Sequence, residues 1–150
     1  RITSIFLRRH INIESLNVSE SEIKDVHRYT IIIRTHEDQI KKIVGQIEKQ
    51  VEVIKAYYHT NSETITQEIA LYKIATENLY EGNLQQIIKE QYARIVEVNK
   101  DFIVVEKSGD YNATKTLYEQ LLPYGMLQFV RSGRIAITKP SMNISAMLNN

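Results

Sequence analysis

The sequence predicts an α+β fold that is organised as two consecutive domains. Its 150 residues are enough for two small hydrophobic cores. Segments with alternating apolar and polar residues, typical of half-buried strands, are interspersed with segments whose apolar residues recur at helical spacing. The polar stretch at residues 59–67 separates two such series, so we interpret it as a linker.

The first domain begins with a helix and two strands. Residues 1–9 carry apolar side chains at helical spacing and end in Arg8 and Arg9, whose positive charges suit the C-terminal end of a helix dipole. Apolar and polar residues alternate over residues 12–19, and residues 27–34 are rich in β-branched and aromatic side chains. We therefore expect two strands, the second more buried than the first.

A helix and a third strand complete this domain, which spans residues 1–58. Thr35 and Asp38 have the spacing of an N-terminal capping pair. The apolar residues that follow are spaced to lie on one helix face: Ile40, Ile43, Val44, Ile47 and Val51. Residues 51–58 are then predicted to form a strand, which gives the order helix, strand, strand, helix, strand.

The second domain, residues 68–138, has the strand and helix order of a ferredoxin-like fold. Asn83 and Asp110 are candidate N-terminal caps of its two helices, and Gly125 helps to end the second one. Strands are expected at residues 68–75, 95–98, 102–105, 126–130 and 135–138. The first domain repeats this split βαβ pattern without its opening strand. Residues 139–150 are predicted to form a tail.

Composition excludes several classes of function. The net charge of +1 lacks the basic excess of a nucleic-acid-binding module, so no nucleic-acid partner is expected. The chain has no cysteine, which rules out a disulfide scaffold, a thiolate zinc site and a thiol nucleophile. No apolar run approaches the roughly 20 residues that span a bilayer, so no membrane partner is expected. We interpret the chain as a cytoplasmic protein.

The reactive side chains form no catalytic or metal-binding pattern. The chain has four histidines, which are His10, His27, His36 and His59. They lack the helical spacing of metal ligands, so no metal site is expected. Five glycines form no phosphate-binding loop. Nine tyrosines leave open an RNA-binding ferredoxin-like domain, although residues 102–105 lack the basic and aromatic pattern that such a strand needs.

Five blocks of the sequence match the pattern of one known family. The first is R-R-H-I-N-I-E-S-L from Arg8, similar to the family's R-R-G-x-N-I-E-S-L. The others are R-Y-T-I from residue 28, Q-I-E-K-Q-V-E-V-I-K from residue 46, E-I-A-L-Y-K-I from residue 68, and P-Y-G-M with R-S-G-R-I-A near the end. Together they resemble the small regulatory subunit of acetolactate (acetohydroxyacid) synthase. His10 stands where the family has glycine, so we expect a strained or differently shaped turn there.

The resemblance implies an N-terminal ACT domain, a module that senses amino acids, followed by the ferredoxin-like domain. It implies a non-catalytic regulatory subunit that activates the catalytic subunit of acetolactate synthase and confers feedback inhibition by a branched-chain amino acid, with valine expected. Thiamine diphosphate, FAD and magnesium are then expected on the catalytic subunit, with no cofactor in this chain. A homodimer is also expected, with the isoleucine-rich helix face and the strand at residues 12–19 as candidates for its two-fold interface.

The expected effector site contains Asn12, the backbone around Ile13, Asn17 and Ser19. An asparagine amide offers both donors and an acceptor to the ammonium and carboxylate groups of an amino acid. Neighbouring isoleucine and valine side chains suit an aliphatic ligand. The alternative for Asn12 is a purely structural role in the turn between helix and strand.

The family pattern also has a strand and a loop, N-x-x-G-x-L-x-R-I, before the helix at residues 1–9. That loop supplies half of the effector site from one protomer, and the Asn12 side comes from the other. The first strand of a ferredoxin-like sheet is central, so we expect further N-terminal residues in the natural protein, or another segment such as residues 140–150 in that place. A stand-alone ACT-type amino-acid sensor is an alternative function, beside the RNA-binding domain.

Overall fold

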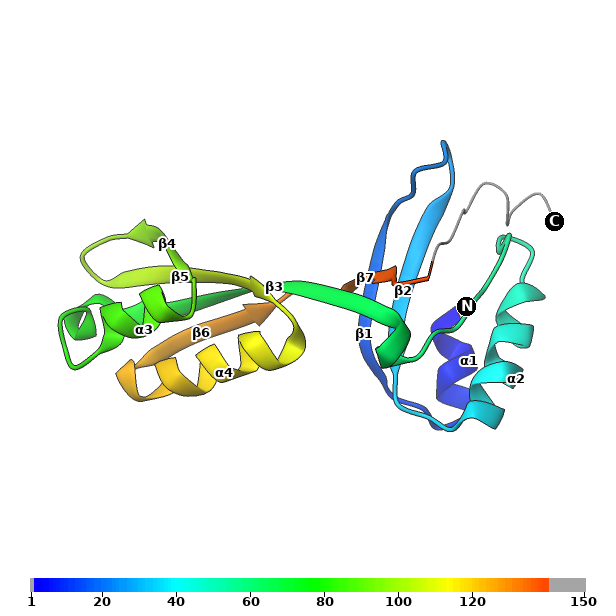
Figure 1. Ribbon diagram of the computed structural model, residues 1–150, viewed down its shortest axis with the longest axis horizontal. Helices are drawn as coiled ribbons and strands as arrows, with labels where there is room; N and C mark the ends of the chain where they lie inside the picture. The colour runs from blue at the N-terminus through cyan, green and yellow to red at the C-terminus, as the bar shows by residue number, and fades with distance from the viewer. Residues whose placement is uncertain (1, 141–150) are drawn as a thin grey trace. The chain divides into compact units, whose positions relative to one another are not determined.

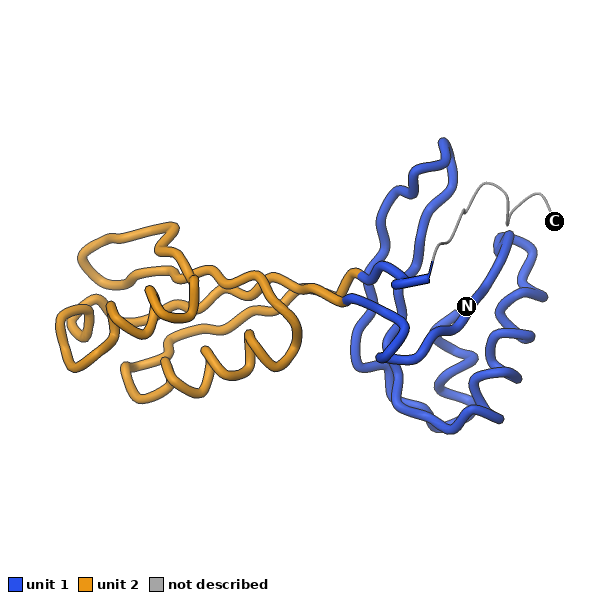
Figure 2. The backbone as a smooth tube through the Cα atoms, in the orientation of Figure 1, with its two compact units in different colours: residues 1–65, 136–150 blue, residues 66–135 orange. Residues whose placement is uncertain are grey.

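The computed structural model describes residues 2–140 (Figure 1). They divide into two compact units: unit 1 contains residues 2–65 and 136–140, and unit 2 contains residues 66–135 (Figure 2). The chain therefore passes from one unit to the other twice. Residues 141–150 of the predicted tail lie outside the described residues.

Unit 1 contains an antiparallel hairpin with two helices on one of its faces (Figure 1). These elements are α1 (Ile2–Arg8), β1 (Ile13–Glu20), β2 (His27–Ile33) and α2 (Glu37–Glu48). β1 pairs with β2, with an irregularity in register between Ile13 and Ser15. The buried core between helices and hairpin consists of Ile5, Phe6, Ile11 and Ile43. The two helices and the first two strands predicted for this region are confirmed.

α1 ends in a Schellman motif that places His10 in the left-handed conformation. The backbone N–H of His10 donates to the Leu7 carbonyl (3.0 Å), and that of Ile11 donates to the Phe6 carbonyl (3.0 Å). His10 has a φ of 56°, which is costly for a residue with a Cβ atom and free for glycine. The strained turn expected at His10 is confirmed, and it directs the chain from α1 into β1.

Replacing His10 with glycine is expected to stabilise unit 1. The substitution removes the left-handed penalty, so the free energy of unfolding should rise by about 1 kcal/mol, visible as a higher urea midpoint. His36→Gly is the matched control, because His36 precedes α2 at a φ of −85°, where glycine brings no such relief. An H10G variant no more stable than the wild type would contradict this expectation.

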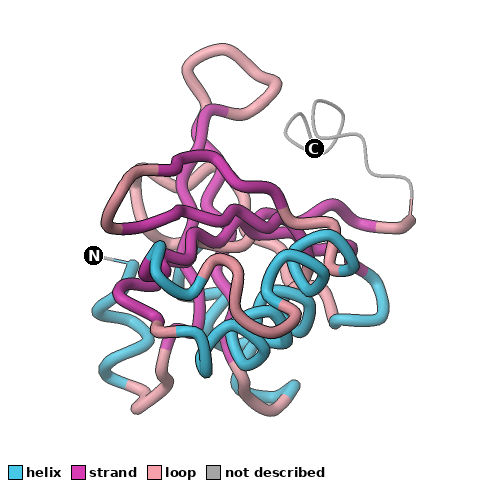
Figure 3. The backbone as a smooth tube through the Cα atoms, turned by 90° about the vertical axis from the view of Figure 1, so that its left-hand side faces the viewer, coloured by secondary structure: helices cyan, strands magenta, loops and turns pink. Residues whose placement is uncertain are grey.

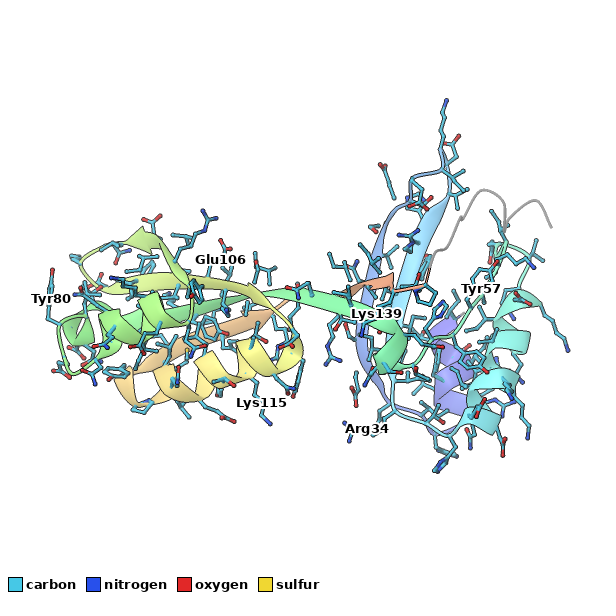
Figure 4. All side chains as sticks on the ribbon, in the orientation of Figure 1. Arg34, Tyr57, Tyr80, Glu106, Lys115 and Lys139 are labelled. Atoms are coloured by element: carbon cyan, nitrogen blue, oxygen red, sulfur yellow. The ribbon has the colours of Figure 1, made fainter. Side chains whose placement is uncertain are left out.

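The strand predicted at residues 51–58 is absent. Turns and extended chain without strand pairing follow α2, and Tyr57 lies in this segment (Figure 4). The backbone N–H of Ala56 donates to the Glu48 carboxylate (3.1 Å) and not to a strand. In a split βαβ sheet the last strand pairs with the first, and the described residues contain no strand before α1. The prediction was wrong because the sequence pattern is strand-like but the described residues offer it no strand to pair with.

The start of α2 also differs from the predicted cap. His36, not Thr35, is the N-terminal cap residue, and its side chain makes no capping hydrogen bond. The acidic residues Glu37 and Asp38 both lie in the first turn, where their charges suit the positive end of the helix dipole. Charge, and not a side-chain cap, therefore supports this helix end.

The predicted linker, residues 59–67, includes ordered structure. Thr60 and Glu63 form a reciprocal capping box around the 3-10 turn η1 (Asn61–Glu63). Strand β3 (Thr64–Ala75) begins directly after this turn, whereas the sequence pattern placed the start of the strand at residue 68. The additional residues at its start include β-branched side chains, which favour an extended backbone.

Unit 2 has the ferredoxin-like order of strands and helices. After β3 come η2 (Thr76–Asn78), α3 (Leu84–Glu90), β4 (Arg94–Val98), β5 (Phe102–Gly109), α4 (Tyr111–Leu121), η3 (Leu122–Tyr124) and β6 (Met126–Arg131). The last strand, β7 (Ile135–Thr138), follows, and all but its first residue belong to unit 1. The sheet order is β4-β5-β3-β6, and β7 also pairs with β3. α3 and α4 cover one face of this sheet (Figure 3). The predicted α+β, ferredoxin-like fold class is confirmed.

Local signals set the helix ends of unit 2. Asp110 Oδ1 accepts a hydrogen bond from the backbone N–H of Ala113 (2.8 Å), as expected for the cap of α4. Gly125 has a φ of 85° and ends η3. Asn83 precedes α3 without a capping hydrogen bond from its side chain. The buried core beneath the helices consists of Ala70, Tyr72, Ile74, Leu84, Ile88, Ile103, Val105, Leu117 and Leu121.

Candidate functional site

The predicted effector residues lie along β1 and the turn before it. Asn12 is exposed and comes shortly after the Schellman motif that ends α1. The side chain of Ile13 packs against the buried core of unit 1. The geometry therefore presents the Asn12 amide to solvent and leaves only the backbone of Ile13 for a ligand.

β1 is an edge strand in the described part of unit 1. It pairs with β2 on one side, and no described strand lies along its other side. The outward N–H and C=O groups of an edge strand can bind the ammonium or carboxylate group of a ligand, or the edge of another strand. The N-terminal end of β1, together with Asn12 before it, thus combines an exposed amide side chain with backbone N–H and C=O groups that face away from β2.

Asn17 and Ser19 do not converge with Asn12 within one chain. Asn17 is half-buried and Ser19 is exposed, and both belong to β1. At a rise of about 3.3 Å per residue, Ser19 lies about 20 Å from Ile13 along the strand. One amino acid is too small to contact both ends of β1, so a single chain presents two separate groups of predicted site residues.

A basic groove between α1 and α2 was not predicted from the sequence. It has a volume of about 770 Å³, and its lining includes Ser4, Arg8, Arg9, Gln46, Lys49 and Gln50. Arg9 Nε donates to Gln46 Oε1 (3.1 Å). The cations lie near the C-terminal ends of the two helices, so the negative ends of the helix dipoles account for their placement without a ligand.

A second charged group, also not predicted, lies in unit 2. The Glu68 side chain is fully buried, with its Oε2 2.7 Å from Arg131 Nε and its Oε1 3.9 Å from Arg134 Nε. Both guanidinium groups lie over the Tyr111 ring, at 4.4 Å and 4.6 Å from its centroid. We call Glu68, Arg131, Arg134 and Tyr111 the arginine cluster. The sequence signal for it was a glutamate in phase with the core residues of β3.

The arginine cluster lies close to the buried phenol of Tyr72. The Tyr72 hydroxyl donates to the Thr114 carbonyl (2.6 Å), and Thr114 Oγ1 accepts from Arg131 Nη2 (3.2 Å). Burial raises the pKa of Tyr72 to about 12; the charge of Arg131 opposes this rise and the charge of Glu68 adds to it. The phenol is therefore a neutral hydrogen-bond donor at physiological pH.

Metal-binding and membrane-spanning features can be assessed for residues 2–140. Within this range, no three histidine, aspartate or glutamate side chains gather in a way that could hold a metal ion. None of the helices described there is long and apolar enough to cross a membrane. The polar features that remain as candidate sites are the edge of β1, the basic groove and the arginine cluster.

Comparison with known proteins identifies the family of both halves of the chain. Residues 1–55 match the family described as the AHAS small subunit-like ACT domain, and residues 67–140 match the family described as the small subunit of acetolactate synthase. The acetolactate synthase small subunit of Bacillus subtilis is 34% identical over 140 residues, which cover 93% of this chain and 81% of that protein. The chain belongs to the acetolactate synthase small-subunit family.

Other members of the acetolactate synthase small-subunit family are similar over nearly the whole chain. The protein of Mycolicibacterium smegmatis is 28% identical over 146 residues, which cover 97% of this chain and 86% of that protein. The crystal structure of the small subunit from Thermotoga maritima matches with a TM-score of 0.83 at 23% identity, covering 94% of this chain and 88% of that one. It shares the fold, and the family expected from five sequence blocks is confirmed.

Proposed function

We propose that this chain is the non-catalytic regulatory subunit of an acetolactate synthase, which activates the catalytic subunit and confers feedback inhibition by valine. The observation that carries the proposal is the match to the two family descriptions, in order, over residues 1–55 and 67–140. A stand-alone ACT-type sensor accounts only for the first match, and an RNA-binding domain accounts for neither. In this proposal thiamine diphosphate, FAD and magnesium belong to the catalytic subunit, and both subunits are cytoplasmic.

The proposed effector site lies at the N-terminal end of β1. The Asn12 amide and the Ile13 backbone supply the donors and acceptors that the ammonium and carboxylate groups of an amino acid require. Leu16 and Val18 are 42% and 47% exposed, but they lie about 10 Å and about 17 Å from Ile13 along the strand, so they offer apolar contacts to this site only from a second copy of β1. This combination suits a small aliphatic amino acid better than a charged one.

A homodimer would bring the two groups of predicted site residues together. If β1 pairs antiparallel with its copy across a two-fold axis, Asn12 of one protomer lies near the end of the other strand that carries Asn17 and Ser19. Pairing would also cover the open edge of β1. Each effector would then be held by both protomers, with no chemistry performed in this chain.

Replacing Asn12 with alanine tests this proposal in the complex with the catalytic subunit. Hydrogen bonds to charged groups contribute about 1.5–3 kcal/mol each, so N12A is expected to raise the valine concentration for half inhibition roughly 10- to 100-fold. The measurement is acetolactate formation during a valine titration. Asn83→Ala is the matched control, because Asn83 is an exposed asparagine of unit 2 whose side chain caps no helix.

Three outcomes of this experiment are informative. Unchanged valine inhibition by N12A would show that the effector site lies elsewhere. A wild-type chain that does not raise the activity of the catalytic subunit would contradict the regulatory function itself. Conversion of pyruvate to acetolactate by the purified chain alone would contradict its non-catalytic role.

A further inference from the structure

The arginine cluster joins the two stretches of chain that enter and leave unit 2. The chain enters this unit at residue 66, and Glu68 is the first buried residue of β3 after that point. It leaves the unit after residue 135, directly after Arg134. We call β3 the entry strand and residues 131–135 the exit segment. The contacts of Glu68 with Arg131 and Arg134 therefore connect the entry strand with the exit segment.

Two hydrogen bonds that involve backbone groups add to this connection between β3 and the exit segment. The backbone N–H of Ile69 donates to Ser132 Oγ (2.9 Å), and the backbone N–H of Ser132 donates to the Ile69 carbonyl (2.9 Å). Ser132 lies in the interruption between β6 and β7, so its hydroxyl takes the place of a backbone acceptor in the ladder. The exit segment is thus held to β3 by both backbone and charge.

The arginine cluster also contacts the first turn of α4. Tyr111 is the first residue of α4 and lies within reach of both guanidinium groups. Arg131 Nη2 donates to Thr114 Oγ1 (3.2 Å), and Thr114 is fully buried. A displacement of the exit segment along β3 must therefore break these contacts or move the beginning of α4.

The buried charges of the arginine cluster fix the arrangement of the segments they join more than they add to the free energy of unfolding. One buried carboxylate faces two guanidinium groups, whose side chains are only 25% and 14% exposed. The cost of removing such ions from water offsets much of their attraction, and apolar residues of similar volume are often as stabilising. The Glu68 oxygens and the two arginine Nε atoms are in ion-pair contact without hydrogen-bond geometry. The hydrogen bond from Arg131 Nη2 to Thr114 Oγ1 is charged and therefore directional, so the cluster favours one arrangement of entry strand, exit segment and α4.

We propose that the arginine cluster couples effector binding in unit 1 to the position of α4 in unit 2. The proposal rests on the regulatory function proposed above, in which valine binds at β1. Along the chain, a change in unit 1 reaches unit 2 through residues 65–66 and 135–136, and the cluster lies where both passages enter unit 2. It converts a displacement of either passage into a displacement of the first turn of α4.

Arg134→Gln is the main test, in the full complex with the catalytic subunit. It removes the longer of the two contacts with Glu68 and leaves the 2.7 Å pair of Glu68 with Arg131. Activation of the catalytic subunit is expected to remain, while the valine concentration for half inhibition rises roughly two- to thirtyfold. Glu68→Gln, which keeps the side-chain shape and removes its charge, is expected to have the same effect.

Arg94→Gln is the matched control on the same sheet. It breaks the 2.7 Å pair of Arg94 with Glu106, which is labelled in Figure 4 and lies outside the arginine cluster. Arg94 is 74% exposed, so its loss is expected to change neither activation nor inhibition. Amide hydrogen exchange adds a second readout: R134Q should speed exchange at residues 111–114 and 132–138 in the valine-bound complex, and R94Q should not.

The outcomes separate this proposal from the regulatory function. If R134Q and E68Q keep wild-type valine inhibition while thermal unfolding shows an intact unit 2, the coupling role is overturned and the regulatory function stands. If E68Q alone fails to fold, R134Q still decides the question. If the wild-type chain confers no inhibition by valine, leucine or isoleucine, the regulatory function is overturned and the coupling role with it.

Discussion

Replacing Ile43 with alanine is expected to unfold unit 1 while unit 2 remains folded. Ile43 is fully buried in a core whose other buried members are Ile5, Phe6 and Ile11. Removing a buried isoleucine side chain to alanine costs about 2–5 kcal/mol, against about 5–15 kcal/mol for a whole domain. A core this small has few other contacts to absorb the loss. The thermal unfolding transition of unit 1 should shift to much lower temperature or disappear.

Leu117→Ala is the corresponding change in unit 2, because Leu117 is fully buried in the larger core of that unit. It should lower the free energy of unfolding of unit 2 by a similar amount. The unfolding temperature of unit 2 then falls, and that of unit 1 stays unchanged. In the complex with the catalytic subunit, I43A should abolish valine inhibition at temperatures at which activation is still present. A single transition that moves equally in both variants would show that the units unfold together, contrary to this expectation.

The second large effect is alkaline destabilisation through Tyr72. Its pKa is about 12 in the folded chain against 10.0 for an ordinary tyrosine, because burial disfavours the phenolate. The neutral phenol therefore contributes stability that is fully present below pH 10 and is lost as the pH rises towards 12. At about 1.36 kcal/mol per pKa unit, the loss amounts to about 2.7 kcal/mol at most.

Tyr72→Phe isolates this effect from the titration of other groups. Near pH 8 the variant should be less stable than the wild type by about 1–3 kcal/mol, because the Thr114 carbonyl loses its donor at 2.6 Å. Between pH 10 and 12 that difference should shrink or reverse, as measured by urea unfolding at each pH. A difference that stays constant over this range would mean that the phenol titrates normally in the folded chain.

Sequence patterns predicted those elements whose determinants are local. Asp110 caps α4 through its own side chain, and Gly125 adopts the left-handed conformation that ends η3. The strained end of α1 at His10 was expected from the family resemblance, because the family has glycine at this position, and it too is a local feature. In each case the residues that interact are a few positions apart, so the pattern contains most of the physical information.

Features that depend on distant partners were not predictable in this way. The segment at residues 51–58 has a strand-like composition, but a strand forms only with a neighbour, and the described chain supplies none. The arginine cluster joins Glu68 to Arg131 through the register of β3 with β6, which no single segment encodes. Of the effector residues, Asn12 was expected at a helix-to-strand junction and lies there, while its function remains a prediction.

The division of unit 1 into two stretches has a consequence for biosynthesis. The backbone N–H of Lys139 donates to the Glu63 carbonyl (2.7 Å), so residues 136–140 complete a unit that began before residue 65. A ribosome releases residues 66–135 as one uninterrupted segment before those closing residues emerge. Unit 1 therefore acquires its closing residues only after the whole of unit 2 has been synthesised, so its folding cannot be completed before unit 2 is present.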